Sequence, residues 1–585
     1  MRKGTLFMVS GGVLALALAG YAGWRLAQAR HVRSIVRAGV APLPDTSRWS
    51  PALVSVVKQY SFEAQTSDHP AKALGQLART YQVNGQFKEA ELALRALRRA
   101  EPENPRWPYY LADLQLKAKV PVEAIALLRT TVELAPDYAP ALIELGDALI
   151  RQKRFAEAQS VFQSAAIFAP SDPRPGANLA YLDLVDSKTR SALERLDAVL
   201  KQHPRFAAGH RLKADVLEKL GQTASAAEER KQERASPPLA IADPWLDELY
   251  DYCFDPYRLQ MVAASLVRAE RFTDAIPYLQ RSVNLSPDEP DFRDTLAEAC
   301  LLAGKLDAAR DALEKGVLAI PDSYVLRVRL ATVLCRQNRA TEALRVVENA
   351  LQRWPEQAEV QAAHGHALLI AGKPSEAVDA FKEALQRNSG LVEAQLNLGR
   401  AYEQLNQPDE AQKCFEQALE IRPTYVEAMI AATGLSIAVG NLANAQRYVS
   451  RLMELAPDRP DVRRVCADAL HLKANALASK GNMDDAERAY RQAIEIDPSL
   501  PLLHAGLGMV YVSTQRLEQA LPELQRFAEL APTDLRAYQL LGETQIALGK
   551  KSDAEKTYQI ALNLAKLADD ATAVGQIEMS IRSLR

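Results

Sequence analysis

Apolar and small residues recur along most of this chain with a step of 34 residues. An apolar stretch ends in proline five times in succession, at Pro102, Pro136, Pro170, Pro204 and Pro238. Two further columns keep the step: small residues at Ala78, Ala112, Gly146, Ala180 and Ala214, and alanines at Ala90, Ala124, Ala158, Ala192 and Ala226. Three independent columns with one period indicate an internal repeat, and a period of about 20–50 residues is typical of solenoids.

Each repeat is predicted to be a pair of antiparallel helices. The small residue in the first helix lets the second helix approach closely, and the alanine in the second helix does the same in return. Glycines such as Gly85 and Gly221 end first helices, where a left-handed residue is needed. The closing proline stops the second helix. Because one pair cannot bury its apolar face alone, neighbouring pairs must stack into a continuous array.

The register of the repeat changes twice. Pro287 follows Pro238 by 49 residues, which is 15 more than the period, and Pro498 follows Pro457 by 41, which is seven more. Seven residues make two helical turns, so a lengthened first helix keeps its face. The helix before the first change carries Arg230 in a column that is otherwise apolar or small. The array is therefore predicted to break into two blocks there.

One repeat carries a motif that identifies the family it resembles. Asn397–Tyr402, followed by Pro408–Ala411, Phe415 and Pro423, is similar to the consensus of the tetratricopeptide repeat. The resemblance covers roughly residues 71–568 and implies an all-α solenoid of about fourteen helical hairpins wound as a right-handed superhelix. The predicted segments are an N-terminal transmembrane anchor or uncleaved signal (1–24), a neck (25–70), a first block of five repeats (71–240), an insertion (241–255), a second block of nine repeats with a seven-residue insertion near 460–466 (256–568), and a capping helix (569–585).

The N-terminal segment is predicted to cross a membrane. Residues 6–24 carry no charge, and a helix of this length spans about 28 Å, close to the hydrocarbon thickness. A cleaved signal peptide is the alternative, with Ala17-Leu18-Ala19 as its site. Arg2 and Lys3 before the run suit export of the body to the periplasm, whereas the arginines after the run favour the opposite orientation.

Composition narrows the classes of function. The formal net charge is −2, which supplies no basic field for nucleic acid. The five cysteines form no C-x-x-C pair and are interpreted as small buried residues. The sequence holds no Walker loop, G-x-S-x-G or H-E-x-x-H motif, and His364 and His366 point to different faces of one helix. No enzyme activity, cofactor, metal or small-molecule substrate is predicted.

The resemblance implies that first-helix residues line a concave groove for partner peptides or helices. Mapping by column gives the groove positions Arg79, Tyr109, Asp113, Asp147, Tyr181, Asp291, Asp294, Glu298, His366, Arg400, Glu403 and Glu543. The charged positions in repeats two, three and seven are mostly acidic and would suit a basic or neutral ligand.

Two aromatic segments are further candidates for partner binding. Trp107, Tyr109 and Tyr110 open the second repeat, and the cluster Trp107–Tyr110 is not expected to face inward as a whole. The insertion combines Trp245, Tyr250 and Tyr252 with several acidic residues. It is either a spacer helix that plugs the junction of the two blocks or a docking site, because large amphipathic aromatics make good interface anchors.

Anchor and array together favour a membrane-tethered scaffold or assembly factor that binds other proteins. They resemble the anchored tetratricopeptide proteins of bacterial envelope biogenesis. The alternative is a non-catalytic regulatory subunit of a membrane-associated enzyme complex.

Overall fold

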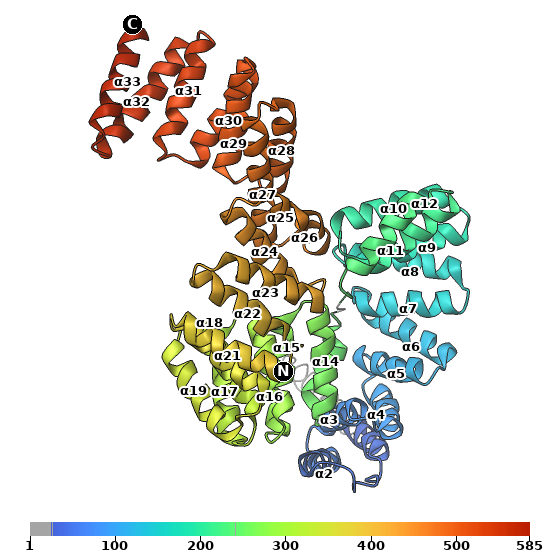
Figure 1. The fold of residues 1–585 in the computed structure, drawn as a ribbon. Helices are drawn as coiled ribbons and strands as arrows, with labels where there is room; N and C mark the ends of the chain where they lie inside the picture. The colour runs from blue at the N-terminus through green and yellow to red at the C-terminus, as the bar shows by residue number, and fades with distance from the viewer. Residues whose placement is uncertain (1–24, 26, 240–241, 585) are drawn as a thin grey trace, which may run out of the picture. The chain divides into compact units, whose positions relative to one another are not determined.

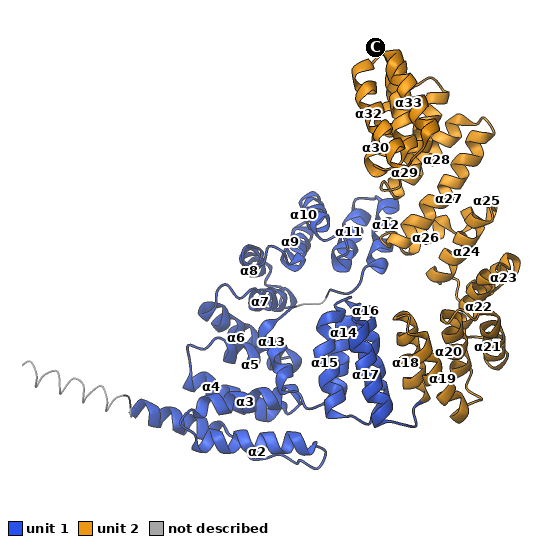
Figure 2. Cartoon of the chain, turned by 90° about the vertical axis from the view of Figure 1, so that its left-hand side faces the viewer, with its two compact units in different colours: residues 1–323 blue, residues 324–585 orange. Residues whose placement is uncertain are grey.

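The structure, a computed structural model, describes residues 25, 27–239 and 242–584. These residues form helices joined by short turns, and none of them lies in a β-strand. The chain divides into two compact units, Met1–Ser323 and Tyr324–Arg585, which are coloured separately in Figure 2. The described part therefore confirms the prediction of an all-α helical solenoid, whose order of helices can be followed in Figure 1.

Most of the helices are first or second members of hairpins. In the first unit they are α2 (Pro51–Thr66), α3 (Pro70–Val83), α4 (Phe87–Ala100), α5 (Arg106–Lys117), α6 (Pro121–Leu134), α7 (Ala139–Arg151), α8 (Phe155–Phe168), α9 (Pro173–Val185), α10 (Thr189–Gln202), α11 (Ala207–Lys219), α12 (Thr223–Ala235), α13 (Pro244–Asp247), η1 (Glu248–Tyr252), α14 (Pro256–Arg268), α15 (Phe272–Leu285), α16 (Pro290–Leu302) and α17 (Leu306–Ala319).

The second unit continues the same alternation. Its helices are α18 (Tyr324–Arg336), α19 (Ala340–Arg353), α20 (Ala358–Ile370), α21 (Pro374–Arg387), α22 (Val392–Gln404), α23 (Pro408–Ile421), α24 (Val426–Ala438), α25 (Leu442–Arg447), α26 (Val449–Leu455), α27 (Pro460–Ser479), α28 (Met483–Ile496), α29 (Pro501–Ser513), α30 (Leu517–Leu530), α31 (Leu535–Ala547), α32 (Lys551–Leu567) and α33 (Ala571–Leu584). The extra residues after Pro457 lengthen α27 to 20 residues, whereas α29 has 13.

The turn inside each hairpin contains one residue with a left-handed backbone. Glycine fills this slot at seven hairpins, among them Gly85 and Gly221, as the sequence predicted. The other hairpins place a residue with a side chain in the same slot, for example Lys153 with φ of 58° and Asn338 with φ of 59°. The turn geometry is therefore common to the repeats, even where the sequence lacks the residue that adopts it most readily.

The core of each hairpin is a small residue facing a large one. A Cβ atom added to Gly146 in α7 would lie 2.5 Å from the Phe162 ring of α8, and one added to Gly399 in α22 would lie 2.3 Å from Phe415 of α23. Both rings are fully buried. The small-residue column thus fixes how closely the two helices of a hairpin approach.

The insertion brings the chain back to the first repeat. The first five stacked hairpins end at α12, which buries only Ala226 and directs Arg230 to the carboxylate of Asp215. After α13 and η1 the chain enters α14, whose Arg258 donates to the carbonyl of Val83 at the end of α3, with an Nη1–O distance of 2.5 Å. The boundary between the compact units consequently falls after α17, within the predicted second block.

The predicted membrane segment, residues 6–24, lies outside the described residues. Within the described ranges, no helix is both long and apolar enough to cross a membrane. The predicted neck contains α2, and its Val57 and Ala64 are buried in the core of the first unit. The C-terminal segment forms α33, which buries Ala573, Ile577 and Ile581 in a cluster with residues of α32.

Glycine-to-alanine substitutions at two positions are predicted to change the stability of the chain in opposite directions. Gly399→Ala should destabilise the chain by about 1–2 kcal/mol, because overpacking against Phe415 typically costs about 1–3 kcal/mol and outweighs the gain of about 1 kcal/mol in helix propensity. Gly434→Ala in α24 should stabilise it by about 0.5–1 kcal/mol, because the new methyl group meets no atom of another segment within 4 Å. Urea denaturation of both variants tests this, and shifts in the same direction would contradict the packing account.

Candidate protein-interaction grooves

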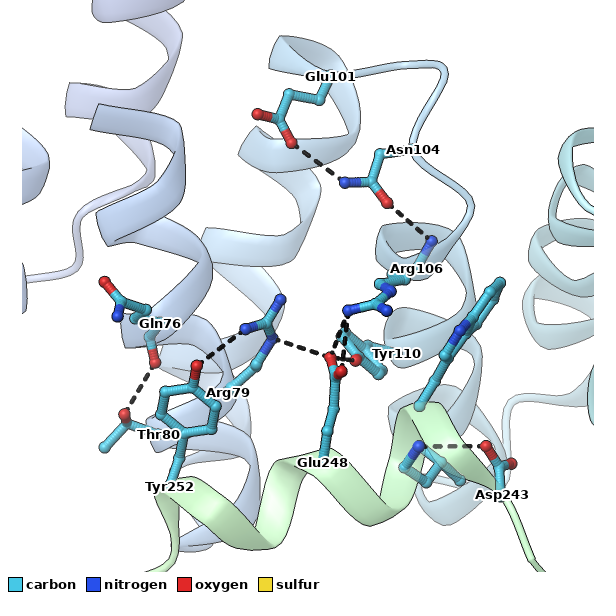
Figure 3. A network of polar contacts seen from close by, with 12 residues as sticks. Gln76, Arg79, Thr80, Glu101, Asn104, Arg106, Tyr110, Asp243, Glu248 and Tyr252 are labelled. Atoms are coloured by element: carbon cyan, nitrogen blue, oxygen red, sulfur yellow. Dashed lines mark hydrogen bonds and ion pairs between the residues drawn. The ribbon is translucent and has the colours of Figure 1, made fainter. Parts of the chain in front are cut away.

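The insertion folds into two short helices that lie against first helices of the first block. Asp243 caps α13 by accepting from the backbone amide of Leu246 at 3.1 Å, and Pro244 occupies the first helical position. Asp255 caps α14 in the same way, accepting from the amide of Tyr257 at 3.0 Å. We call Asp243–Tyr252 the internal segment, and Figure 3 shows it crossing below α3 and α5.

Glu248 is the centre of the polar contacts between the internal segment and the repeats. Its two carboxylate oxygens accept from Nη1 of Arg106 at 2.9 and 2.8 Å. The Tyr110 hydroxyl also donates to it, and Nε of Arg79 lies 3.5 Å away. Arg79 comes from α3 and Arg106 from α5, so a single carboxylate joins the first two repeats, as Figure 3 shows. Charge-assisted contacts of this kind are stronger than neutral ones.

Asp243 makes the corresponding contacts one repeat further along. It is buried and accepts from the hydroxyls of Tyr109 and Tyr138, with an Oη–Oδ1 distance of 2.5 Å for Tyr138. Burial, followed by the charge of Asp243 and the hydrogen bonds to it, raises the pKa of both phenols far above the usual value. Both tyrosines therefore remain protonated donors to Asp243.

Between Asp243 and Glu248, aromatic contacts of Trp245 hold the internal segment against the repeats. The Trp245 ring stacks on Tyr138 with centroids 3.6 Å apart and planes inclined by 9°. It also meets the Tyr109 ring edge to face at 5.6 Å, and the guanidinium of Arg106 lies 5.7 Å from its centroid. Stacked and cation–π contacts of this type favour an aromatic side chain at this place.

The end of the internal segment binds the first repeat and the sixth. Nη1 of Arg79 donates to the Tyr252 hydroxyl at 3.0 Å, and Asn84 donates to the Tyr252 carbonyl at 2.8 Å. Tyr250 packs edge to face on Tyr278 of α15, and its carbonyl accepts from Arg281 at 2.9 Å. The internal segment thus connects helices that are far apart in sequence.

One expectation about the first block was wrong. All four residues of the cluster Trp107–Tyr110 are buried, because the internal segment covers the face of α5 that would otherwise be open. The internal segment on this face is acidic, and the expectation that the groove suits a basic or neutral partner stays a prediction. Arg79 and Arg106 supply positive charge where the segment lies, although Asp113 lies on α5 as well.

The other predicted groove residues are distributed over separate helices. Asp113 accepts from Gln82 at 2.8 Å and from Lys117 at 2.7 Å, and Asp147 accepts from Asn178 at 2.9 Å. Burial raises the pKa of Asp147. Tyr181 is 36% exposed on α9. Asp294 and Glu298 lie on α16, and Arg400 lies exposed on α22.

The second unit contains an open groove lined by first helices of its last three hairpins. Its volume is about 670 Å³, and its lining is mostly apolar. Leu502 and Met509 of α29 are 51% and 55% exposed in it. Gly506 lies between them, and a Cβ atom there would lie 2.3 Å from the Tyr490 ring, so this glycine lets Tyr490 form the floor. Arg536 and Glu543 of α31 add charge to the lining.

Sequence reasoning found part of these two grooves. It named Glu543 as a groove position but missed Leu502 and Met509, although their apolar character on a first-helix face was a usable signal. It also missed Tyr138 and Arg106 as contacts of the insertion. The usable signal for these two residues was chemical complementarity, because hydrogen-bond donors in the array match the acidic residues of the insertion.

The cysteines and histidines of the described residues do not gather into a metal-binding group. All five cysteines are buried and unpaired, as predicted, and burial raises the pKa of Cys335 to about 12. Burial lowers the pKa of His366 to about 4, so its imidazole is neutral at physiological pH. In the part of the chain that the structure describes, no three metal-binding side chains converge.

Comparison with known proteins places the repeats in one family. Sequence models described as tetratricopeptide or TPR repeats match residues 76–139, 115–180, 178–239, 266–329, 328–392, 368–420, 409–469 and 474–515. The Hsp70-Hsp90 organizing protein of Triticum aestivum is 29% identical over 98 residues, which is 17% of this chain and 17% of that protein. The match therefore spans less than a fifth of this curated relative.

Solved structures with similar helical arrays share little sequence with the chain. The APC/C hetero-tetramer Cut9-Hcn1 is 13% identical, with 91% of this chain and 98% of that chain covered and a TM-score of 0.31. A thermophilic TPR protein of Thermus thermophilus is 22% identical, with 31% and 99% covered and a TM-score of 0.30. The human IFIT1 dimer with m7Gppp-AAAA is 18% identical, with 67% and 90% covered and a TM-score of 0.34. Likenesses at these TM-scores carry no inference about function.

Proposed function

Because the chain belongs to the tetratricopeptide repeat family, we propose that it is a scaffold that binds segments of other proteins along its first helices. The observation that supports this most directly is the open groove of the second unit. Leu502 and Met509 expose apolar side chains above a floor of buried aromatic residues, and three successive first helices contribute to the lining. A groove of this form suits an extended or helical segment with aliphatic side chains.

The scaffold is further proposed to be anchored in a membrane by residues 6–24. This uncharged run of 19 residues, with Arg2 and Lys3 before it, supports insertion with the repeats outside the cytoplasm. A tethered array of this kind would gather partners at the bilayer, as in the assembly of a bacterial envelope. The alternative, a non-catalytic subunit of a membrane-associated enzyme complex, would be favoured by a co-purifying activity that is lost when the repeats are removed.

Binding in the groove of the second unit is tested by selecting random displayed peptides against the purified chain. Met509→Lys should weaken the selected peptides at least about tenfold, because it replaces an apolar contact with a charge that the ligand would desolvate. Met579→Lys in α33 is the matched control, since Met579 is 65% exposed outside the groove and its replacement should leave binding unchanged. Peptides that bind equally well to the Met509 variant would contradict the proposal.

Anchoring is tested by cell fractionation and by reporters fused to Arg585. The full chain should stay with the membranes in high salt and be released by detergent, and deletion of residues 1–24 should make it soluble. A reporter active only outside the cytoplasm should give signal at the intact length. A cleaved product would rule out the anchor, and a reporter active only inside the cytoplasm would rule out export.

A further inference from the structure

The carboxylates of the internal segment accept hydrogen bonds from arginine and tyrosine side chains of the repeats. Arg106 and Tyr110 donate to the carboxylate of Glu248, and Tyr109 and Tyr138 donate to that of Asp243. The face formed by α3, α5 and the start of α7, where Tyr138 precedes the helix, therefore presents guanidinium and phenol donors. We call this face the donor groove.

The donor groove has the composition of a recognition site for acidic aromatic segments. Arg106 meets Glu248 through both carboxylate oxygens, and its guanidinium also faces the Trp245 ring at 5.7 Å. Arg79 lies 5.4 Å from the Tyr252 ring and 5.5 Å from the buried Trp107 ring. Arginine is suited to this double task because its planar cation both binds carboxylates and stacks on rings.

The internal segment has the features of a ligand more than those of a repeat. It consists of a four-residue helix and a five-residue 3₁₀ helix, too short to be stable alone. Its Trp245, Tyr250 and Tyr252 side chains are only partly buried and pack on helices of the repeats. The hairpins α3–α4, α5–α6 and α7–α8 also pack on one another directly, and the segment adds one buried side chain, Leu249, to their core.

We propose that the donor groove is a binding site for an acidic aromatic segment of a partner protein, and that the internal segment is its built-in competitor. The recognised pattern is an aspartate two residues before a tryptophan and a glutamate three residues after it, as Asp243, Trp245 and Glu248 stand here. The tether gives the internal segment a high effective concentration, so a partner binds well only when the segment is displaced. This proposal rests on the proposed scaffold function and assigns a second groove and its class of partner.

The test uses the full chain and a fluorescent peptide with the sequence of residues 242–255. The peptide is titrated against the wild-type chain and against a variant with Asp243→Asn, Trp245→Ala and Glu248→Gln, which weakens the competitor but leaves the donor groove intact. A peptide with the same three changes is the matched control. Circular dichroism checks folding, and Glu248→Gln alone replaces the triple variant if the latter unfolds.

The peptide should bind the variant at least about tenfold more tightly than the wild-type chain. The control peptide should bind neither chain, and adding Arg106→Gln to the variant should abolish the gain. A folded variant that fails to bind the peptide would overturn the proposal and leave the segment as a fixed part of the core. Dimerisation of the variant without peptide binding would also overturn it, with a second copy of the chain as the occupant. Both results leave the Met509 test of the second unit unaffected.

Discussion

The structure depends on how closely two helices approach within each hairpin. A glycine or alanine in the first helix faces a buried ring or aliphatic side chain in the second, as Gly146 faces Phe162 and Gly399 faces Phe415. This contact sets the angle at which each first helix is presented. Because each hairpin must then cover its apolar face with the next, the contact also determines that first helices line up side by side. Both candidate grooves are products of this alignment.

The insertion is a segment of the array that does not follow the repeat. It lacks the apolar periodicity needed to stack, and it is held instead by two carboxylates, each of which receives several donors. Burying a carboxylate is costly unless its hydrogen bonds are satisfied, and Asp243 meets this condition with two tyrosine hydroxyls and the backbone amide of Leu246. The polar contacts therefore specify where the segment lies, while Trp245 and its aromatic neighbours provide apolar burial.

The sequence predicted the features that the repeat imposes and missed those that it does not. The columns were sufficient for the helical hairpins and for the glycine turns, since both follow from contacts within one period. They did not predict that Lys153 and Asn338 adopt the glycine conformation, because no glycine marks the turn at these hairpins. The columns also could not predict where on the repeats the insertion binds. Glu248 and Arg106 are separated by 142 residues, and no periodicity links them.

The most direct test of this account is hydrogen exchange at the internal segment of the wild-type chain and of Arg106→Gln. The Trp245 amide donates to the Tyr138 hydroxyl, and the amide of Phe254, two residues beyond the segment, donates to Asn84, so neither bond exists unless the segment lies on the repeats. Both amides should exchange at least about tenfold more slowly than in a free peptide, and Arg106→Gln should remove much of this protection. Exchange at the free-peptide rate in the wild-type chain would contradict the account, because the segment would then not occupy the groove.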